Sequence, residues 1–254
     1  MKINIVKIQT KDLRSKFLHE NRQGDPYAAA NLAASYALMN DFDEAEFWIG
    51  EARARGAGNR WELEARHSVA SWSGDWDALF RAGQLHQAAD GAEWQGYASL
   101  GQSDWEAARA SFKRNLSRLE FRRGDAPHGG VLMSLVGLAL AEKRLGLESW
   151  VEHAAGARAF TEDRLGVAMN FGSWPSTNGN YILARIAAIE GDVERVVIHM
   201  RTAMEQNELE IQFFANDPFF AEVRDEPRLL EMASAARARG LAEHRKLRPV
   251  GAPN

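Results

Sequence analysis

A short phrase returns four times along this chain of 254 residues. Each copy has a turn residue, an aspartate and an aromatic or apolar residue, and then continues with the spacing of an amphipathic helix. Repetition of one helix-starting signature predicts a stack of helix hairpins, in which each repeat buries its apolar face against its neighbours. The copies are Asn40-Asp41-Phe42-Asp43-Glu44-Ala45, Gly74-Asp75-Trp76-Asp77-Ala78, Ser103-Asp104-Trp105-Glu106-Ala107-Ala108 and Gly191-Asp192-Val193-Glu194-Arg195-Val196.

The aspartate of each copy has a local structural role. Its carboxylate can accept a hydrogen bond from the free amides at the start of the following helix, and its charge suits the positive end of the helix dipole. The Asp-x-Asp pairs that begin at Asp41 and Asp75 also look like metal-binding pairs. Capping explains their position without a metal, so we expect neither a metal site nor a cofactor.

The first hairpin is expected over residues 26–56. Its residues resemble the tetratricopeptide repeat (TPR), whose pattern is W-x2-L-G-x2-Y followed by A-x3-F and a proline. Ala29 and Ala57 stand where the pattern has its tryptophan and its proline. The residues that carry the resemblance are Leu32-Ala33-x2-Tyr36 and Ala45-x3-Ile49 with Ala52.

Four further hairpins are expected over residues 61–88, 93–119, 131–160 and 180–207. The resemblance implies an all-α fold, a right-handed superhelical solenoid of about five TPR-like hairpins. We expect an extended N-terminal arm at residues 1–11, the helical-repeat domain at 12–239 and a C-terminal tail at 240–254.

The C-terminal part of the repeat domain places a proline behind an acidic residue twice. The two segments resemble those that close the TPR regions of bacterial signalling proteins and transcription regulators. A terminal repeat must cover its last apolar face, so we expect each segment to start a short capping helix. The segments are Asn216-Asp217-Pro218-Phe219-Phe220 and Asp225-Glu226-Pro227-Arg228-Leu229-Leu230.

Composition excludes several classes of function. A formal net charge of -4, from 31 Lys and Arg against 35 Asp and Glu, gives no electrostatic drive toward nucleic acid or an anionic membrane. The absence of cysteine excludes disulfides and thiol catalysis, and no phosphate-binding loop or nucleophile motif is found. The most apolar stretch, 131–141, is shorter than the ~20 residues of a membrane span. We expect a cytoplasmic, bacterial protein that is not an enzyme.

In TPR folds the first helix of each hairpin lines a concave groove, and the resemblance implies the same here. Aromatic residues with polar tips suit such a binding surface. The register instead places Trp76 and Trp105 between helices, in the core. The groove candidates for binding a partner are Tyr27, Asn31, Trp61, Glu64, Glu93, Trp94, Tyr97, Asn178, Tyr181 and Arg185.

Three functions are compatible with this pattern. The leading hypothesis is a non-catalytic protein–protein interaction module that binds a peptide or helix of a partner in the groove; a homodimer is compatible with it. The second is a small-molecule-binding sensor or regulatory domain of a bacterial signalling system. The third is an enzyme on a helical-repeat scaffold, whose signature would be polar side chains that converge in a pocket.

Overall fold

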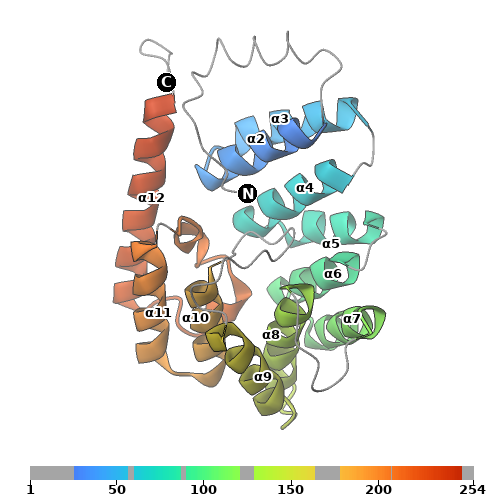
Figure 1. Ribbon diagram of the computed structural model, residues 1–254, viewed down its shortest axis with the longest axis vertical. Coiled ribbons are helices and arrows are strands. Elements are labelled where there is room, and N and C mark those ends of the chain that lie inside the picture. Colours follow the sequence, from blue (N-terminus) through green and yellow to red (C-terminus); the bar gives the residue numbers. More distant parts are fainter. Residues whose placement is uncertain are drawn as a thin grey trace.

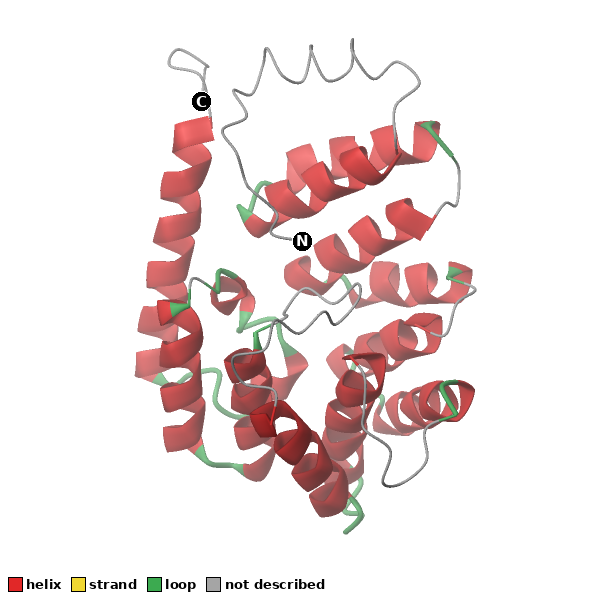
Figure 2. Ribbon diagram, viewed as in Figure 1, coloured by secondary structure: helices red, strands yellow, loops and turns green. Residues whose placement is uncertain are grey.

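The computed structural model describes residues 26–56, 60–86, 90–120, 129–163, 178–206 and 208–247. These residues form eleven α-helices and two short 3-10 helices, and no strand is found among them (Figure 2). The predicted all-α class is confirmed for this part of the chain. The expected arm at residues 1–11 lies outside the described residues.

The helices follow one another with short connections. Ten of them lie at the ranges that the five predicted hairpins occupy. In chain order the α-helices are α2 (Pro26–Leu38), α3 (Phe42–Ala54), α4 (Arg60–Ser73), α5 (Trp76–Leu85), α6 (Asp90–Gly101), α7 (Trp105–Arg118), α8 (Gly129–Arg144), α9 (Trp150–Asp163), α10 (Gly179–Glu190), α11 (Val193–Glu205) and α12 (Pro227–Leu247). The 3-10 helices η1 (Glu210–Phe213) and η2 (Pro218–Phe220) lie between α11 and α12.

The repeated phrase forms the same turn four times. In each copy the residue before the aspartate has a positive φ, between 61° and 82°. The aspartate side chain then accepts a hydrogen bond from the backbone amide three residues further on, as predicted for a helix cap. The capping aspartates are Asp41, Asp75, Asp104 and Asp192.

The helices are arranged in two rows. Each helix packs against the next in the chain, and further contacts join α2 to α4, α6 to α8 and α8 to α10. The ring of His67 on α4 stacks on that of Trp94 on α6, so α2, α4, α6, α8 and α10 form one row, which we call the inner row. Figure 1 shows the helices following an arc from α2 to α11, with α12 beside α11 and the connection between these two reaching toward the middle.

That connection, residues 208–226, packs against helices from both ends of the arc, and we call it the closing segment. It supplies a phenylalanine to each of the three hydrophobic clusters of the described residues. Phe213 joins the cluster of α2–α4, Phe219 joins the large cluster centred on α6 and α8, and Phe220 joins the cluster of α10–α12. One stretch of chain thus links three cores.

Polar contacts fix the closing segment to the first helices of the chain. The Gln212 side-chain amide donates to the carbonyl oxygen of Leu38 at 2.8 Å, and that of Asn216 donates to the carbonyl oxygen of Trp72 at 2.7 Å. Both acceptors lie at the C-terminal ends of helices, where carbonyl groups lack partners within the helix. The segment therefore closes the arc as well as covering α10 and α11.

The two acidic-proline segments begin helices of different length. Pro218 starts the short η2 as expected, but Pro227 starts α12, which has 21 residues. This helix continues to Leu247, so the tail expected from residue 240 begins inside it. None of the helices in the described ranges combines the length and the apolar character that crossing a membrane requires.

Close packing in the large core depends on two glycines that face one ring. The ring of Phe112, on α7, lies between Gly96 of α6 and Gly137 of α8. A Cβ atom at Gly137 would lie 2.3 Å from the ring, and one at Gly96 would lie 2.8 Å from it. Side chains at these positions cannot be accommodated unless Phe112 moves.

We therefore expect Gly137→Ala to destabilise the protein by about 1–3 kcal/mol, because the added methyl group overpacks the core. Gly156, on the exposed face of α9, is the matched control, since a Cβ there meets no atom within 4 Å. Gly156→Ala should stabilise by up to about 1 kcal/mol through helix propensity. Urea unfolding measures the change in the free energy of unfolding for both variants. A change of the same sign in both would contradict this packing.

Candidate functional site

Helix α10 is buried on all sides. Every residue from Asn180 to Ile189 is buried, including the charged Arg185. Neighbouring helices cover part of α10, and η2 packs against it as well. A helix that lines an open groove keeps a polar stripe exposed to water. On α10 the closing segment covers the face where such a stripe would lie.

Arg185 meets the closing segment in a buried ion pair. Its Nε and Nη2 atoms donate to Oδ2 of Asp217 at 2.8 and 2.7 Å. Both residues are only 4% exposed. The guanidinium also lies over three aromatic rings, with centroids 4.8 Å away at Tyr181, 5.2 Å at Phe219 and 5.9 Å at Tyr97. These residues together we call the Arg185 site.

Asp217 is held in place by its position at the start of η2. Its Oδ1 accepts from the backbone amide of Phe219 at 3.1 Å, and its Oδ2 accepts from the hydroxyl of Tyr181 at 3.2 Å. The proline that follows Asp217 occupies the first position of η2 and has no amide to satisfy. The Asp-Pro motif thus directs one carboxylate at Arg185.

The electrostatics of the site follow from burial. Burial works against the charge of Arg185, but the attraction of Asp217 outweighs it, so the pKa of Arg185 lies above its usual value. Burial raises the pKa of Tyr97 and of Tyr181, and the charge of Asp217 raises both further. The two phenols therefore stay neutral. Burial, with Glu208 nearby, also raises the pKa of Glu210 well above that of an ordinary carboxyl group.

A small polar cavity adjoins the ion pair. Its volume is about 10 Å³, which is about the space that one buried water needs. Aromatic, acidic and hydroxyl groups surround it, and they come from α4, α6, α10 and the closing segment. The lining residues are Ser71, Trp72, Tyr97, Tyr181, Arg185, Glu210, Phe213 and Asp217.

Three of the predicted groove residues meet in the Arg185 site. Tyr97, Tyr181 and Arg185 converge as expected for one surface, but the closing segment covers them. Phe219 stacks on Tyr97 with a centroid distance of 6.0 Å, and Phe213 stacks on Trp72 at 5.6 Å. The predicted groove surface is therefore occupied here by the chain itself.

A second group of predicted residues lies together at the other end of the inner row. Tyr27 and Asn31 are on α2, and Trp61 and Glu64 are on α4; all four are partly exposed. The rings of Tyr27 and Trp61 meet edge to face with centroids 4.6 Å apart. We call these four residues the α2–α4 patch.

The remaining predicted residues do not line an open surface. Trp94 is 0% exposed, because α6 turns this side chain toward His67 and His86, whose rings lie 4.6 and 4.4 Å away. Glu93 is buried and accepts a hydrogen bond from Asn115 at 3.3 Å. The expectation that these two residues line the groove is therefore wrong, because both are buried in the core. Asn178 caps α10 through its side-chain oxygen.

Sequence reasoning missed the partners that complete the site. Asp217 was recognised only as the start of a capping helix, and Glu210, Trp72 and Ser71 were assigned no role. The one available signal was an aspartate inside the aromatic run from Phe213 to Phe220. A charge in such a run needs a buried partner of opposite sign.

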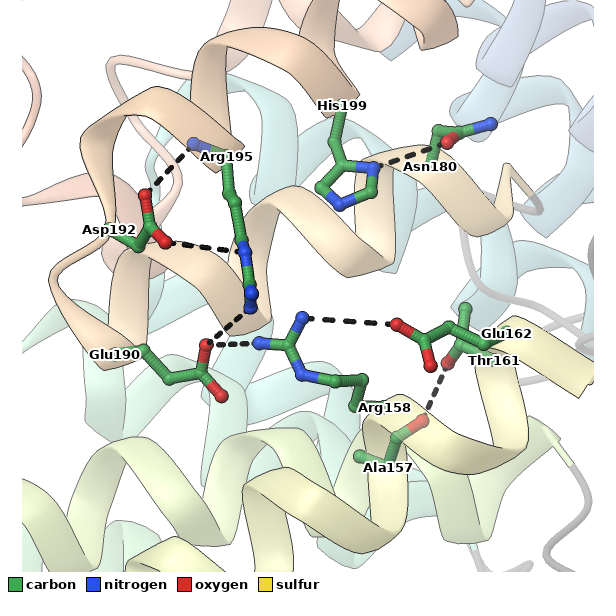
Figure 3. A network of polar contacts seen from close by, with 9 residues as sticks. All are labelled: Ala157, Arg158, Thr161, Glu162, Asn180, Glu190, Asp192, Arg195 and His199. Atoms are coloured by element: carbon green, nitrogen blue, oxygen red, sulfur yellow. Dashed lines mark hydrogen bonds and ion pairs between the residues drawn. The ribbon is translucent and has the colours of Figure 1, made fainter.

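A second polar network joins α9, α10 and α11 near the surface (Figure 3). Arg158 pairs with Glu190, and Arg195 lies 3.9 Å from Glu190 and 3.3 Å from Asp192. The side chain of Arg195 is 54% exposed, and exposed pairs of this kind contribute less than about 1 kcal/mol each. We interpret this network as a structural link between the helices.

Among the described residues, no three His, Asp or Glu side chains are grouped so that they could hold a metal ion. Comparison of the chain with protein-family models, curated proteins and solved structures finds no match. Function has therefore to be inferred from the residues and their geometry.

Removing one partner of the buried ion pair should be strongly destabilising. Arg185→Met leaves the Asp217 carboxylate buried and unpaired, which is expected to cost about 3–5 kcal/mol. Asp217→Asn likewise leaves the Arg185 guanidinium buried without a counter-charge. The double variant should lose much less unfolding free energy than the two single variants lose together, since it removes both charges. A double-mutant cycle by urea unfolding measures this coupling, and additive losses would contradict it.

The buried imidazole of His67 should make stability depend on pH. Burial, together with His86, lowers the pKa of His67 from 6.5 to about 3. Between these values the unfolded chain binds a proton at His67 that the folded chain does not bind. The free energy of unfolding should therefore fall as pH drops from 6.5 toward 3, by up to about 1.4 kcal/mol per pH unit. Urea unfolding at several pH values should give a shallower slope for His67→Gln, and equal slopes would exclude this role.

Proposed function

We propose that the chain is a TPR-like module, a right-handed superhelix of five helix hairpins, which binds a peptide or helix of another protein and catalyses no reaction. The positions of the ten helices from α2 to α11 support the hairpins. The identical capped turns support a repeat. The proposal places the module in the cytoplasm, in keeping with its lack of cysteine.

The carrying observation is that the inner row already holds an aromatic and acidic segment of its own chain, folded as turns and two short 3-10 helices. Phe213 stacks on Trp72, Phe219 stacks on Tyr97, and Asp217 pairs with an arginine of α10. These are the anchors that peptide grooves use, aromatic side chains in pockets around a central charge. The inner row therefore has the chemistry of a peptide-binding surface.

An external partner is not expected to displace the closing segment. Seven of its apolar residues are buried, and each contributes roughly 1.5–3 kcal/mol by burial. Their sum is on the order of 10 kcal/mol or more, which is similar to the whole stability of an ordinary domain. The residues are Ile211, Phe213, Phe214, Pro218, Phe219, Phe220 and Val223.

We therefore place the partner on the α2–α4 patch. The rings of Tyr27 and Trp61 offer apolar area that is only partly covered. Asn31 and Glu64 add polar groups at the same end of the inner row. An apolar side chain of the partner would contact the two rings, while its polar neighbours meet Asn31 and the ion pair that Glu64 forms with Arg60 at 2.5 Å, as in helix-in-groove recognition.

A sensor for a small molecule is the second candidate, and the polar cavity of the Arg185 site favours it. Sites for metabolites usually enclose about 300–1,000 Å³, whereas this cavity has about 10 Å³. A ligand of metabolite size would have to displace the closing segment. The geometry therefore supports a binding module better than a metabolite sensor.

Trp61→Ala should weaken partner binding by at least about tenfold, since truncation of a central aromatic anchor costs more than 1 kcal/mol. Ile198→Ala, on α11 at the other end of the arc, is the matched control because this side chain is 55% exposed. The readout is a quantitative pull-down from lysate of the cell that expresses the protein, with circular dichroism to verify folding. Equal capture by Trp61→Ala and Ile198→Ala would rule out the α2–α4 patch.

A further inference from the structure

The cavity of the Arg185 site has a net charge that its own residues do not balance. Arg185 is the one basic residue among those that line it, against the two carboxyl groups of Asp217 and Glu210. Asp217 is paired with Arg185 at 2.7 Å, which leaves Glu210, itself only 5% exposed. A buried carboxylate without a counter-charge is strongly unfavourable, so either a proton or a cation must neutralise it.

The cavity also has hydrogen-bond acceptors that no described residue satisfies. Oγ of Ser71 is buried and has no hydrogen-bond partner within the described ranges. In the same part of the chain, no side-chain hydrogen bond is found at the Glu210 carboxyl group; the backbone amide of Glu210 donates to Oε1 of Glu208 at 3.1 Å. Because Ser71 and Glu210 line the same cavity, one occupant that donates hydrogen bonds can serve both.

Aromatic rings complete the surroundings of the cavity. Trp72 and Phe213 stack with rings 5.6 Å apart and both line it, together with Tyr97. Aromatic rings attract cations through their negative faces. Arg185 already shows this chemistry next door, where its guanidinium lies over Tyr97, Tyr181 and Phe219.

From these observations we propose that the cavity binds a protonated amine, an ammonium ion or the ammonium end of a small primary amine. Its N–H groups donate to the Glu210 carboxylate and to Oγ of Ser71. The volume of about 10 Å³ fits a group the size of a water molecule. This site is separate from the α2–α4 patch and does not depend on the proposed partner.

The alternative occupant is a proton on Glu210 with a neutral water beside it. Burial raises the pKa of Glu210, Glu208 and Asp217 raise it further, and Arg185 lowers it; the neutral phenols of Tyr97 and Tyr181 complete the surroundings. Without a cation, burial therefore favours the protonated, neutral form of the Glu210 carboxyl group. Binding of ammonium releases this proton, so the affinity for ammonium should increase as pH rises.

Thermal unfolding of the full chain in ammonium chloride and in sodium chloride of equal ionic strength tests the proposal. At an ammonium concentration about ten times its Kd, we expect Tm to be about 2–4 °C or more higher than in sodium chloride. The difference should be larger at mildly alkaline than at mildly acidic pH. Methylammonium chloride distinguishes free ammonium from the end of a larger amine. The ammonium-specific increment should vanish in Glu210→Gln and persist in Glu231→Gln, a control on the exposed face of α12.

Equal Tm values in the two salts would overturn the proposal and assign a proton and a water to the cavity. An ammonium-specific increment that persists in Glu210→Gln would also overturn it, because the cation would then bind elsewhere. If Glu210→Gln does not fold, NMR of ¹⁵N-labelled ammonium with the wild-type chain gives the answer. Bound ammonium protons with contacts to the rings of Trp72 or Tyr97 would support the site, and their absence would exclude it.

Discussion

The ion pair between Arg185 and Asp217 is the contact on which the closed arrangement of the chain depends. Its two members lie 32 residues apart, one in the middle of α10 and the other at the first turn of η2. Desolvation of two charges is costly, and a pair of this kind contributes little net stability even when its geometry is good. We infer that its effect is on specificity, because only one register of the closing segment places Asp217 against Arg185, with the hydroxyl of Tyr181 as a third member.

That register determines how the cores are connected. With Asp217 in place, Phe213, Phe219 and Phe220 enter three different hydrophobic clusters. A row of repeats that contact only their neighbours can unfold one part at a time. Here the closing segment contacts α4 and α10 together, so opening either end of the arc exposes apolar surface at the other. We infer that this arrangement makes unfolding more cooperative than in an open array of hairpins.

The parts of the fold that were predictable are those that local sequence controls. Each capping aspartate, such as Asp104, acts on an amide three residues away, so its turn could be recognised without knowledge of the fold. The position of the groove residues depends on contacts distant in sequence. Trp94 was expected in the groove but stacks on His67, 27 residues earlier. The occupant of the inner row could not be predicted, since helical periodicity gives no information about which distant segment covers a face.

The same geometry separates the buried Arg185 site from the proposed recognition surface along the inner row. At the Arg185 site the ion pair is tied to the packing of the closing segment, so substitution of Arg185 or Asp217 acts on the fold before it can act on a ligand. At the α2–α4 patch, Tyr27 and Trp61 contact each other while part of each ring stays exposed. Ser71 and Trp72 lie at the end of α4 opposite to Trp61, so one helix belongs to both regions. A ligand in the cavity would affect the patch only if it shifted α4 as a unit, because coupling between two sites requires an element that both sites bias.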